Sequence, residues 1–263
     1  NSIKKINFYE QLLLIILVYL ISSVFIALPY YLSNYQITFF DSVFESFSGI
    51  TSTGFSIFGN IKYLDPTLIL WRSSSQWIGG LYFLIFLIII FSNNQYNFRL
   101  NHLVFTGNMG SFSKSNTKNI LLQIFLVYSL LTLLILIILN IGNVRLFNSL
   151  NLSMTIISNG GFLPTNSLDQ IFLKDNRYIL AITLLIPTIN IFFLFNLFNK
   201  RRILNDHQED LFLIAFILIL SLVMFYSLKN VDISEILINI ISSISNSGIS
   251  FTKSSSGTII FIF

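Results

Sequence analysis

Apolar residues gather in long blocks along this chain, and polar residues are largely confined to the stretches between the blocks. Each block holds about 18 to 25 residues, the length with which an α-helix crosses the hydrocarbon core of a bilayer. Apolar and polar positions do not alternate within a block, which argues against a transmembrane barrel. We therefore predict membrane-spanning helices over residues 11–32, 67–92, 120–141, 178–199 and 211–228.

Composition supports lipid as the solvent for much of the chain. Only 10% of the 263 residues are charged, against about 25% in soluble domains, and the mean hydropathy is +0.77. The absence of cysteine excludes disulfides, thiolate metal sites and cysteine nucleophiles. The basic residues are scattered, so we expect no nucleic-acid partner. The first apolar block is too long for a signal-peptide core, and we interpret it as a retained helix.

Two kinds of connection alternate between the blocks. One kind is polar and basic, and the other holds a short amphipathic stretch, a glycine and a return to the membrane. Basic residues near helix ends mark the cytoplasmic side. The cluster Lys200-Arg201-Arg202 therefore places the polar connections in the cytoplasm. The polar connections are residues 93–119 and 200–210, and the returning ones are 39–66, 146–177 and 232–256.

The returning connections contain one pattern three times, without gaps. Thirteen positions before a glycine stands a polar residue, a hydroxyl residue stands three positions before it, and a hydrophobic residue follows it. Fixed spacing of this kind indicates a structural repeat. The polar, hydroxyl and glycine positions are Asp41, Thr51 and Gly54, then Asn148, Ser158 and Gly161, then Glu235, Ser245 and Gly248.

Each repeat matches the physics of a re-entrant pore loop. A short helix of about ten residues dips into the membrane, and its polar first residue caps the free N–H groups. Its C-terminal end carries partial negative charge and points toward the bilayer centre. The chain returns through small residues and a glycine, which permits backbone angles that turn carbonyl oxygens inward. A ring of such carbonyls replaces the water shell of a dehydrated cation.

A single segment of this kind between two membrane helices is most often an ordinary turn. Three copies in register, each between an outer and an inner helix, favour the pore-loop interpretation. We predict that the three loops converge on one axis and bind potassium. The candidate filter residues are Thr51, Ser52, Thr53 and Gly54 of the first loop, Ser158, Asn159, Gly160 and Gly161 of the second loop, and Ser245, Asn246, Ser247 and Gly248 of the third loop.

These motifs resemble those of the superfamily of potassium transporters that includes TrkH, KtrB and the plant HKT proteins, and are most similar to its TrkH branch. The likeness rests on four features: the run from Thr51 to Ser56, the spacing of Trp71-Arg72, Gln76-Trp77 and Gly79-Gly80 in the following helix, Gly160-Gly161-Phe162 in the second loop, and Asn190. It extends from Phe8 to Phe263.

The resemblance implies an all-α integral membrane fold, with units of outer helix, re-entrant pore loop and inner helix around a pseudo-symmetric pore. It implies potassium uptake across the bacterial cytoplasmic membrane by a multi-pass subunit, with potassium as the transported ligand and no cofactor. It also implies a homodimer and a cytosolic nucleotide-binding regulator of the TrkA type. The expected divisions are residues 8–92 (first repeat), 93–119 (loop), 120–199 (second repeat), 200–210 (loop) and 211–263 (third repeat).

The sequence departs from the family in having no fourth pore loop, and it ends inside the expected third inner helix. We therefore expect a partial chain. Two alternatives to potassium uptake stay open: a non-conducting truncated membrane subunit with a structural role, and a coupled secondary cation carrier. The carrier alternative predicts ionisable residues buried at the membrane midplane, and the sequence pattern indicates none.

Three further expectations concern Arg72, the acidic residues and enzyme motifs. Arg72, in an otherwise apolar helix, is expected to pair with Asp41, Glu45 or Asp65. Acidic residues on the loop side are expected to draw cations toward the mouth of the pore. No Ser–His–Asp arrangement or Walker loop occurs in the sequence, so we expect no enzyme. Seven acids are expected on this side: Asp41, Glu45, Asp65, Asp169, Asp175, Asp232 and Glu235. Neutralising Asp41, Glu45, Asp232 and Glu235 together is expected to lower uptake.

Overall fold

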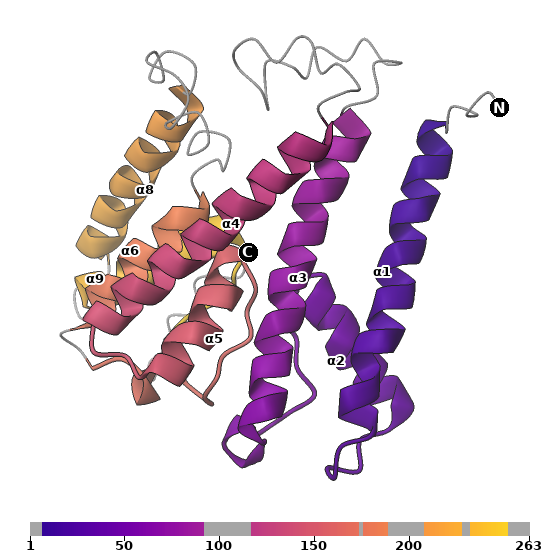
Figure 1. The fold of residues 1–263 in the computed structure, drawn as a ribbon. Coiled ribbons are helices and arrows are strands. Elements are labelled where there is room, and N and C mark those ends of the chain that lie inside the picture. Colours follow the sequence, from indigo (N-terminus) through magenta and orange to yellow (C-terminus); the bar gives the residue numbers. More distant parts are fainter. Residues whose placement is uncertain (1–6, 92–116, 174–175, 189–207, 228–231, 252–263) are drawn as a thin grey trace.

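The computed structural model describes residues 7–91, 117–173, 176–188, 208–227 and 232–251. Throughout these ranges the regular elements are helices, labelled as in Figure 1, and no strand occurs among them. Short 3-10 turns cover Ile61–Tyr63 and Leu168–Gln170. The α-helices are α1 (Phe8–Tyr31), α2 (Phe39–Ile50), α3 (Pro66–Phe91), α4 (Thr117–Ile141), α5 (Leu146–Ile157), α6 (Arg177–Thr188), α8 (Gln208–Ser227) and α9 (Ile233–Ser245).

The helices group into repeated units, as the sequence predicts. A long outer helix packs against a short helix in each unit: α1 on α2, α4 on α5 and α8 on α9. In the first unit α2 lies between the lower halves of α1 and α3 (Figure 1). The inner helix of one unit contacts the short helix of the next, α3 on α5 and α6 on α9. The repeated units are therefore linked in series through their short helices.

Three helix starts lie three residues before their predicted positions, at Phe8 for α1, Thr117 for α4 and Gln208 for α8. Polar residues continue a helix beyond its apolar block, so hydropathy alone places the start too late. Several predictions lie outside the described residues. They concern residues 93–116 and 200–207 of the polar connections, Asn190, and residues 252–263.

The outer surface of the fold is apolar. Among the described residues, two helices are long and apolar enough to cross a membrane, Phe8–Tyr31 and Leu121–Ile141. Only 17% and 22% of their most apolar stretches are buried in the protein, so most of this surface points outward. A continuous exposed apolar surface of this extent suits contact with lipid.

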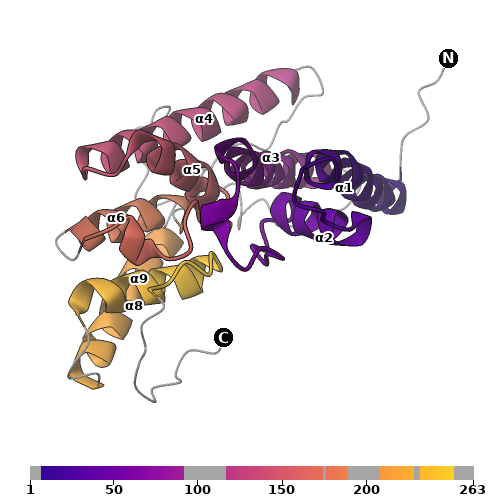
Figure 2. The same cartoon turned by 90° about the horizontal axis from the view of Figure 1, so that it is seen from below.

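The short helix α2 has the opposite distribution. Its buried residues are mostly polar or small: Ser42, Glu45, Ser46, Ser48, Gly49 and Ile50. Seen from below (Figure 2), α2 lies on one side of α3, and α5, α6 and α9 lie on the other. The first short helix thus turns a largely polar face into the protein, whereas the buried face of α9 is mostly isoleucine.

Candidate functional site: a junction of three glycine loops

The short helices start in the same register. They begin at Phe39, Leu146 and Ile233, each fifteen positions before the glycine of its repeat. The repeated polar residues Asp41, Asn148 and Glu235 therefore stand inside the first turn and are not N-caps, so the predicted capping role is wrong.

The residues that precede the helices differ chemically, which is why the repeat does not reveal the caps. The true N-cap of α2 is Thr38, whose hydroxyl oxygen accepts the amide of Asp41 at 3.2 Å. Arg145 and Asp232 precede α5 and α9 without a side-chain capping bond.

The short helices also end alike. The repeated hydroxyl residue turns its side chain back onto the helix and donates to a carbonyl of the last turn. Such bonds close each helix at the same position and let the loop leave in the same direction. They run from Thr51 to Phe47 O (2.7 Å), from Ser158 to Thr155 O (3.0 Å) and from Ser245 to Ser242 O (3.2 Å).

A left-handed residue follows in every loop. Ser52, Asn159 and Asn246 have φ of 54°, 52° and 55°. The amide of the next residue then donates to the carbonyl five positions back, which is the bond of a Schellman turn. Positive φ in the first loop is therefore not confined to its glycine. These bonds are Thr53 N to Ser48 O (3.0 Å), Gly160 N to Thr155 O (2.8 Å) and Ser247 N to Ser242 O (3.1 Å).

The left-handed conformation of Asn246, whose side chain is exposed, can be tested by substitution. Asn246→Val should destabilise the protein by about 1–2 kcal/mol, because a β-branched residue is strained in the left-handed region. Asn246→Gly should be neutral. Thermal unfolding in detergent measures both, with Ser243→Val on the exposed face of α9 as the control. Equal unfolding temperatures for all three variants would contradict the assignment.

The predicted convergence of the loops is confirmed. A Cβ atom placed on Gly54 would lie 2.7 Å from the Cα of Gly161 and 2.8 Å from its nitrogen. One placed on Gly161 would lie 3.0 Å from Ser247 O and 3.4 Å from the Cα of Gly54. Backbone atoms of all three loops therefore meet at Gly161. We call the meeting point of Gly54, Gly161 and Ser247 the glycine junction.

The twelve candidate filter residues contribute unequally to this arrangement. Gly248 lies apart, because a Cβ there would have no neighbour within 4 Å, so the third loop reaches the junction through the carbonyl of Ser247. Both Gly54 and Gly248 adopt positive φ, 83° and 65°. The remaining residues lie in the loops before the junction and differ in burial. Thr51, Thr53 and Asn246 are exposed, Ser52, Asn159 and Ser245 are half-buried, and Ser158 and Gly160 are buried.

Glycines of α3 let the loops lie close against this helix. A Cβ on Gly79 would collide with the backbone of Ile50 at the end of α2. One on Gly80 would lie 2.8 Å from the Cβ of Ser158 in the second loop. The helix α3 is thus in contact with the ends of two short helices.

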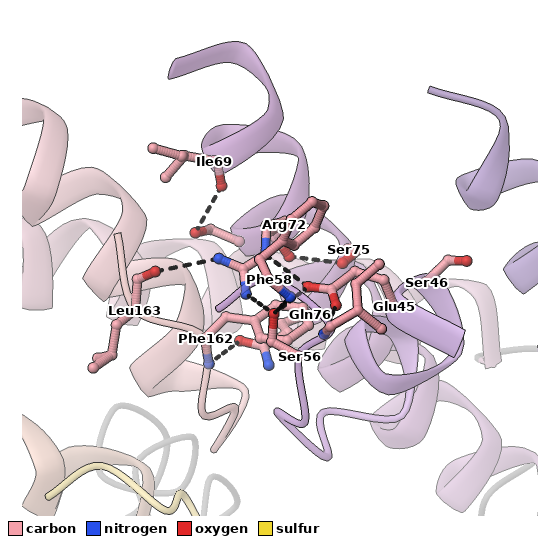
Figure 3. Close-up of polar contacts among 12 residues, drawn as sticks. Glu45, Ser46, Ser56, Phe58, Ile69, Arg72, Ser75, Gln76, Phe162 and Leu163 are labelled. Carbon is pink, nitrogen blue, oxygen red and sulfur yellow. Dashed lines mark hydrogen bonds and ion pairs between the residues drawn. The ribbon is translucent and has the colours of Figure 1, made fainter. Parts of the chain in front are cut away.

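A buried ion pair lies beside the junction (Figure 3). The Nε of Arg72 donates to Glu45 Oε1 at 2.8 Å, and the two side chains are 1% and 0% exposed. The pairing predicted for Arg72 is confirmed, with Glu45 as the partner. The carboxylate also accepts the Ser56 hydroxyl (3.0 Å) and the Ile57 amide (2.8 Å) of the chain that returns from the first loop.

The same guanidinium reaches the second loop. Arg72 donates to Ser56 Oγ at 2.9 Å and to Leu163 O at 3.4 Å. Its guanidinium carbon lies 4.2 Å from the ring centre of Phe162, within the range of a cation–π contact. One arginine therefore ties α2, α3 and the returning segments of two loops together.

A second arginine has a similar place between the second and third units. Arg177, at the start of α6, donates to Asp169 Oδ1 at 2.9 Å and to Glu235 Oε1. Its guanidinium carbon lies 4.4 Å from the ring centre of Phe251, beyond the third loop. Neighbouring units are thus joined by guanidinium groups at both boundaries.

The acids expected at the pore mouth differ in their pairing. Glu45 is paired with Arg72, whereas Glu235 shares Arg177 with Asp169 and Asp232. Asp232 is exposed and lies 3.9 Å from Arg177. Asp41 is exposed but accepts the hydroxyl of Thr38 at 2.6 Å. That these acids draw cations toward the mouth of the pore stays a prediction.

Comparison with known proteins gives relatives that are longer than this chain, and no family model matches it. An uncharacterized cation transporter of Methanocaldococcus jannaschii is 29% identical over 167 residues, 62% of this chain and 34% of that protein. The Trk system potassium uptake protein TrkI of Halomonas elongata is 38% identical over 73 residues, 28% of this chain and 15% of that protein. TrkG of Escherichia coli is 33% identical over 73 residues, 27% of this chain and 15% of that protein.

One solved structure matches nearly the whole chain. The crystal structure of the potassium transporter TrkH from Vibrio parahaemolyticus superposes with a TM-score of 0.76 at 18% identity. The match covers 95% of this chain and 53% of TrkH, so the chain spans about half the length of that transporter. The chain therefore has the TrkH fold, and the predicted resemblance of its loop motifs to Trk potassium transporters is confirmed.

Proposed function

We propose that this chain forms three sides of a cation pathway through the membrane, and that the pathway carries potassium into the cell. The observation that carries the proposal is the glycine junction, where three loops of the same construction meet. The relatives are a cation transporter and potassium uptake proteins, which supports the same function.

The chemistry follows from how the short helices end. Helices α2, α5 and α9 each run into a loop of the junction, so the negative ends of their dipoles lie beside it. Loop carbonyls not used in the Schellman turns are then available to a cation that has shed its water. In this proposal the backbone carbonyl oxygens of the twelve loop residues are the ligands of the cation. Potassium is the transported ion, and the proposed transport needs no cofactor.

A fourth side is needed to close a ring of carbonyls. On one face of α2, Phe44 is 50% exposed and Phe47 is 41% exposed. The equivalent residues of α9, Ile238 and Ile241, are fully buried in a helix that α6 covers. We propose that the inner helix of a fourth unit, which the family resemblance implies, covers α2 in the same way.

The remaining family features extend the proposal. We propose a multi-pass protein of the bacterial cytoplasmic membrane that works as a homodimer with a nucleotide-binding regulator of the TrkA type. The carrier alternative gains no support from the buried charges of the described residues. Glu45 is held by Arg72 and two further donors, so its charge is compensated within the protein.

Growth of a potassium-uptake-deficient bacterium tests the proposal. The complete gene product that carries this chain should restore growth on micromolar potassium, and added sodium should not replace the potassium. A membrane-inserted product that leaves growth unrestored would contradict the proposal and favour the non-conducting subunit. Restoration by sodium alone would contradict the proposed ion.

A further inference from the structure

Gln76 is a buried residue of α3 that sequence reasoning did not single out as functional. It is 0% exposed, and its side chain leaves the first unit to reach the second loop (Figure 3). Its Oε1 accepts the amide of Phe162 at 3.3 Å. Phe162 follows Gly161 directly, so this bond holds the chain one residue from the point where all three loops meet.

The amide group of Gln76 also occupies the space that a side chain at position 160 would need. A Cβ on Gly160 would lie 2.7 Å from Gln76 Nε2. The backbone carbonyl of Gln76 accepts the hydroxyl of Ser52 at 3.5 Å, from the first loop. One residue of an inner helix therefore touches two of the three loops.

Two buried polar atoms at this contact have no partner among the described residues. One is the donor Gln76 Nε2, and the other is the acceptor Asn159 Oδ1, in the residue before Gly160. Buried polar groups are nearly always hydrogen-bonded, so each exception calls for an explanation. A free donor thus lies against a loop that carries a free acceptor, and a small rotation of either amide changes how the loop is held.

We propose that Gln76 is a positioning residue that sets the backbone of the second loop and, through it, the preference for potassium over sodium. The inference rests on the proposed function, because it requires the loops to bind the ion. The physical reason is that a carbonyl ring discriminates by the placement and number of its oxygens. A side chain that fixes the amide beside Gly161 fixes the oxygens on that side of the ring.

The test compares Gln76→Leu with Gln76→Glu in the complete transporter reconstituted in vesicles, with rubidium and sodium uptake as the readouts. Gln76→Leu removes both polar groups, and we expect the rubidium-to-sodium ratio to fall about five-fold, the effect of one lost hydrogen bond. Gln76→Glu keeps the acceptor for Phe162 and should retain most of the ratio. Gln123→Leu, on the exposed face of α4, is the matched control and should leave the ratio unchanged.

A purely structural role would lower the amount of folded protein and leave the ratio unchanged. An unchanged ratio in Gln76→Leu, with a parent that transports selectively, would therefore overturn the inference while the proposed function stands. A parent that transports neither ion would instead overturn the proposed function, and with it the selectivity role.

Thermal unfolding tests the contact between Gln76 and Gly160 without a transport measurement. Gly160→Ala should lower the unfolding temperature, because its new Cβ meets the Gln76 amide. Adding Gln76→Ala should restore part of the loss, since it removes the clashing group. Additive losses in the double variant would contradict the contact on which the inference stands.

Discussion

Arg72→Ala is expected to destabilise the protein by about 3–5 kcal/mol, because it leaves Glu45 buried without its partner. Both side chains are almost fully buried, and their separation of 2.8 Å leaves no room for water between them. The change also removes the donors that hold Ser56 and Leu163. Denaturation of the purified protein in detergent measures the loss.

Two further variants separate the ion pair from a general effect of losing an arginine. Arg145→Ala is the control, because Arg145 is exposed just before α5 and makes no side-chain capping bond. It should change stability by less than about 0.5 kcal/mol. The double variant Arg72→Met/Glu45→Gln should lose less stability than the sum of its single variants. Each single variant leaves one buried charge without its partner, and the double variant leaves none. Additive losses would contradict the pairing.

Gly54→Ala is expected to reduce potassium uptake by more than about ten-fold. Two physical effects add at this position. The φ of 83° is strained for any residue with a Cβ, and the new atom would lie 2.7 Å from the backbone of Gly161. Because a backbone cannot swing away as a side chain can, the two loops must separate at the glycine junction. Growth on micromolar potassium measures the loss.

Other glycines give a graded control series. Gly59 lies in the segment that returns from the first loop, has open space around it and does not adopt positive φ, so Gly59→Ala should behave as the parent. Gly248→Ala should have an intermediate effect, because its φ of 65° is strained but its surroundings are open. Growth of Gly54→Ala equal to that of Gly59→Ala would show that Gly54 is not part of the ion pathway.

The repeated units were predictable because their signals are local and recur at fixed spacing. A hydroxyl residue three positions before a glycine, found three times, marks the end of each short helix and the turn that follows. The left-handed residues carried a signal too, since Asn at positions 159 and 246 is the residue, after glycine, that most readily takes this conformation. Ser52 carried no such signal, because serine has no special preference for positive φ.

The contacts between units could not be predicted in the same way. Gln76 lies among three serines and a tryptophan on α3, and no periodicity tells which of these side chains faces a loop 86 positions away. Arg72 was more accessible to prediction because a charge in an apolar helix requires a partner. The choice of Glu45 over Asp41 and Asp65 depends on the direction in which α2 packs against α3, which the sequence does not encode locally.

The most direct test of the central claim, that three loops meet to bind a dehydrated cation, is a crystal structure of the complete gene product grown with rubidium. Its anomalous scattering locates the ion independently of the protein. We predict a rubidium peak beside Gly54, Gly161 and Ser247, surrounded by backbone oxygens of the three loops. Loops lying more than about 15 Å apart, too far for carbonyls to share one ion, or rubidium found only elsewhere, would contradict the claim.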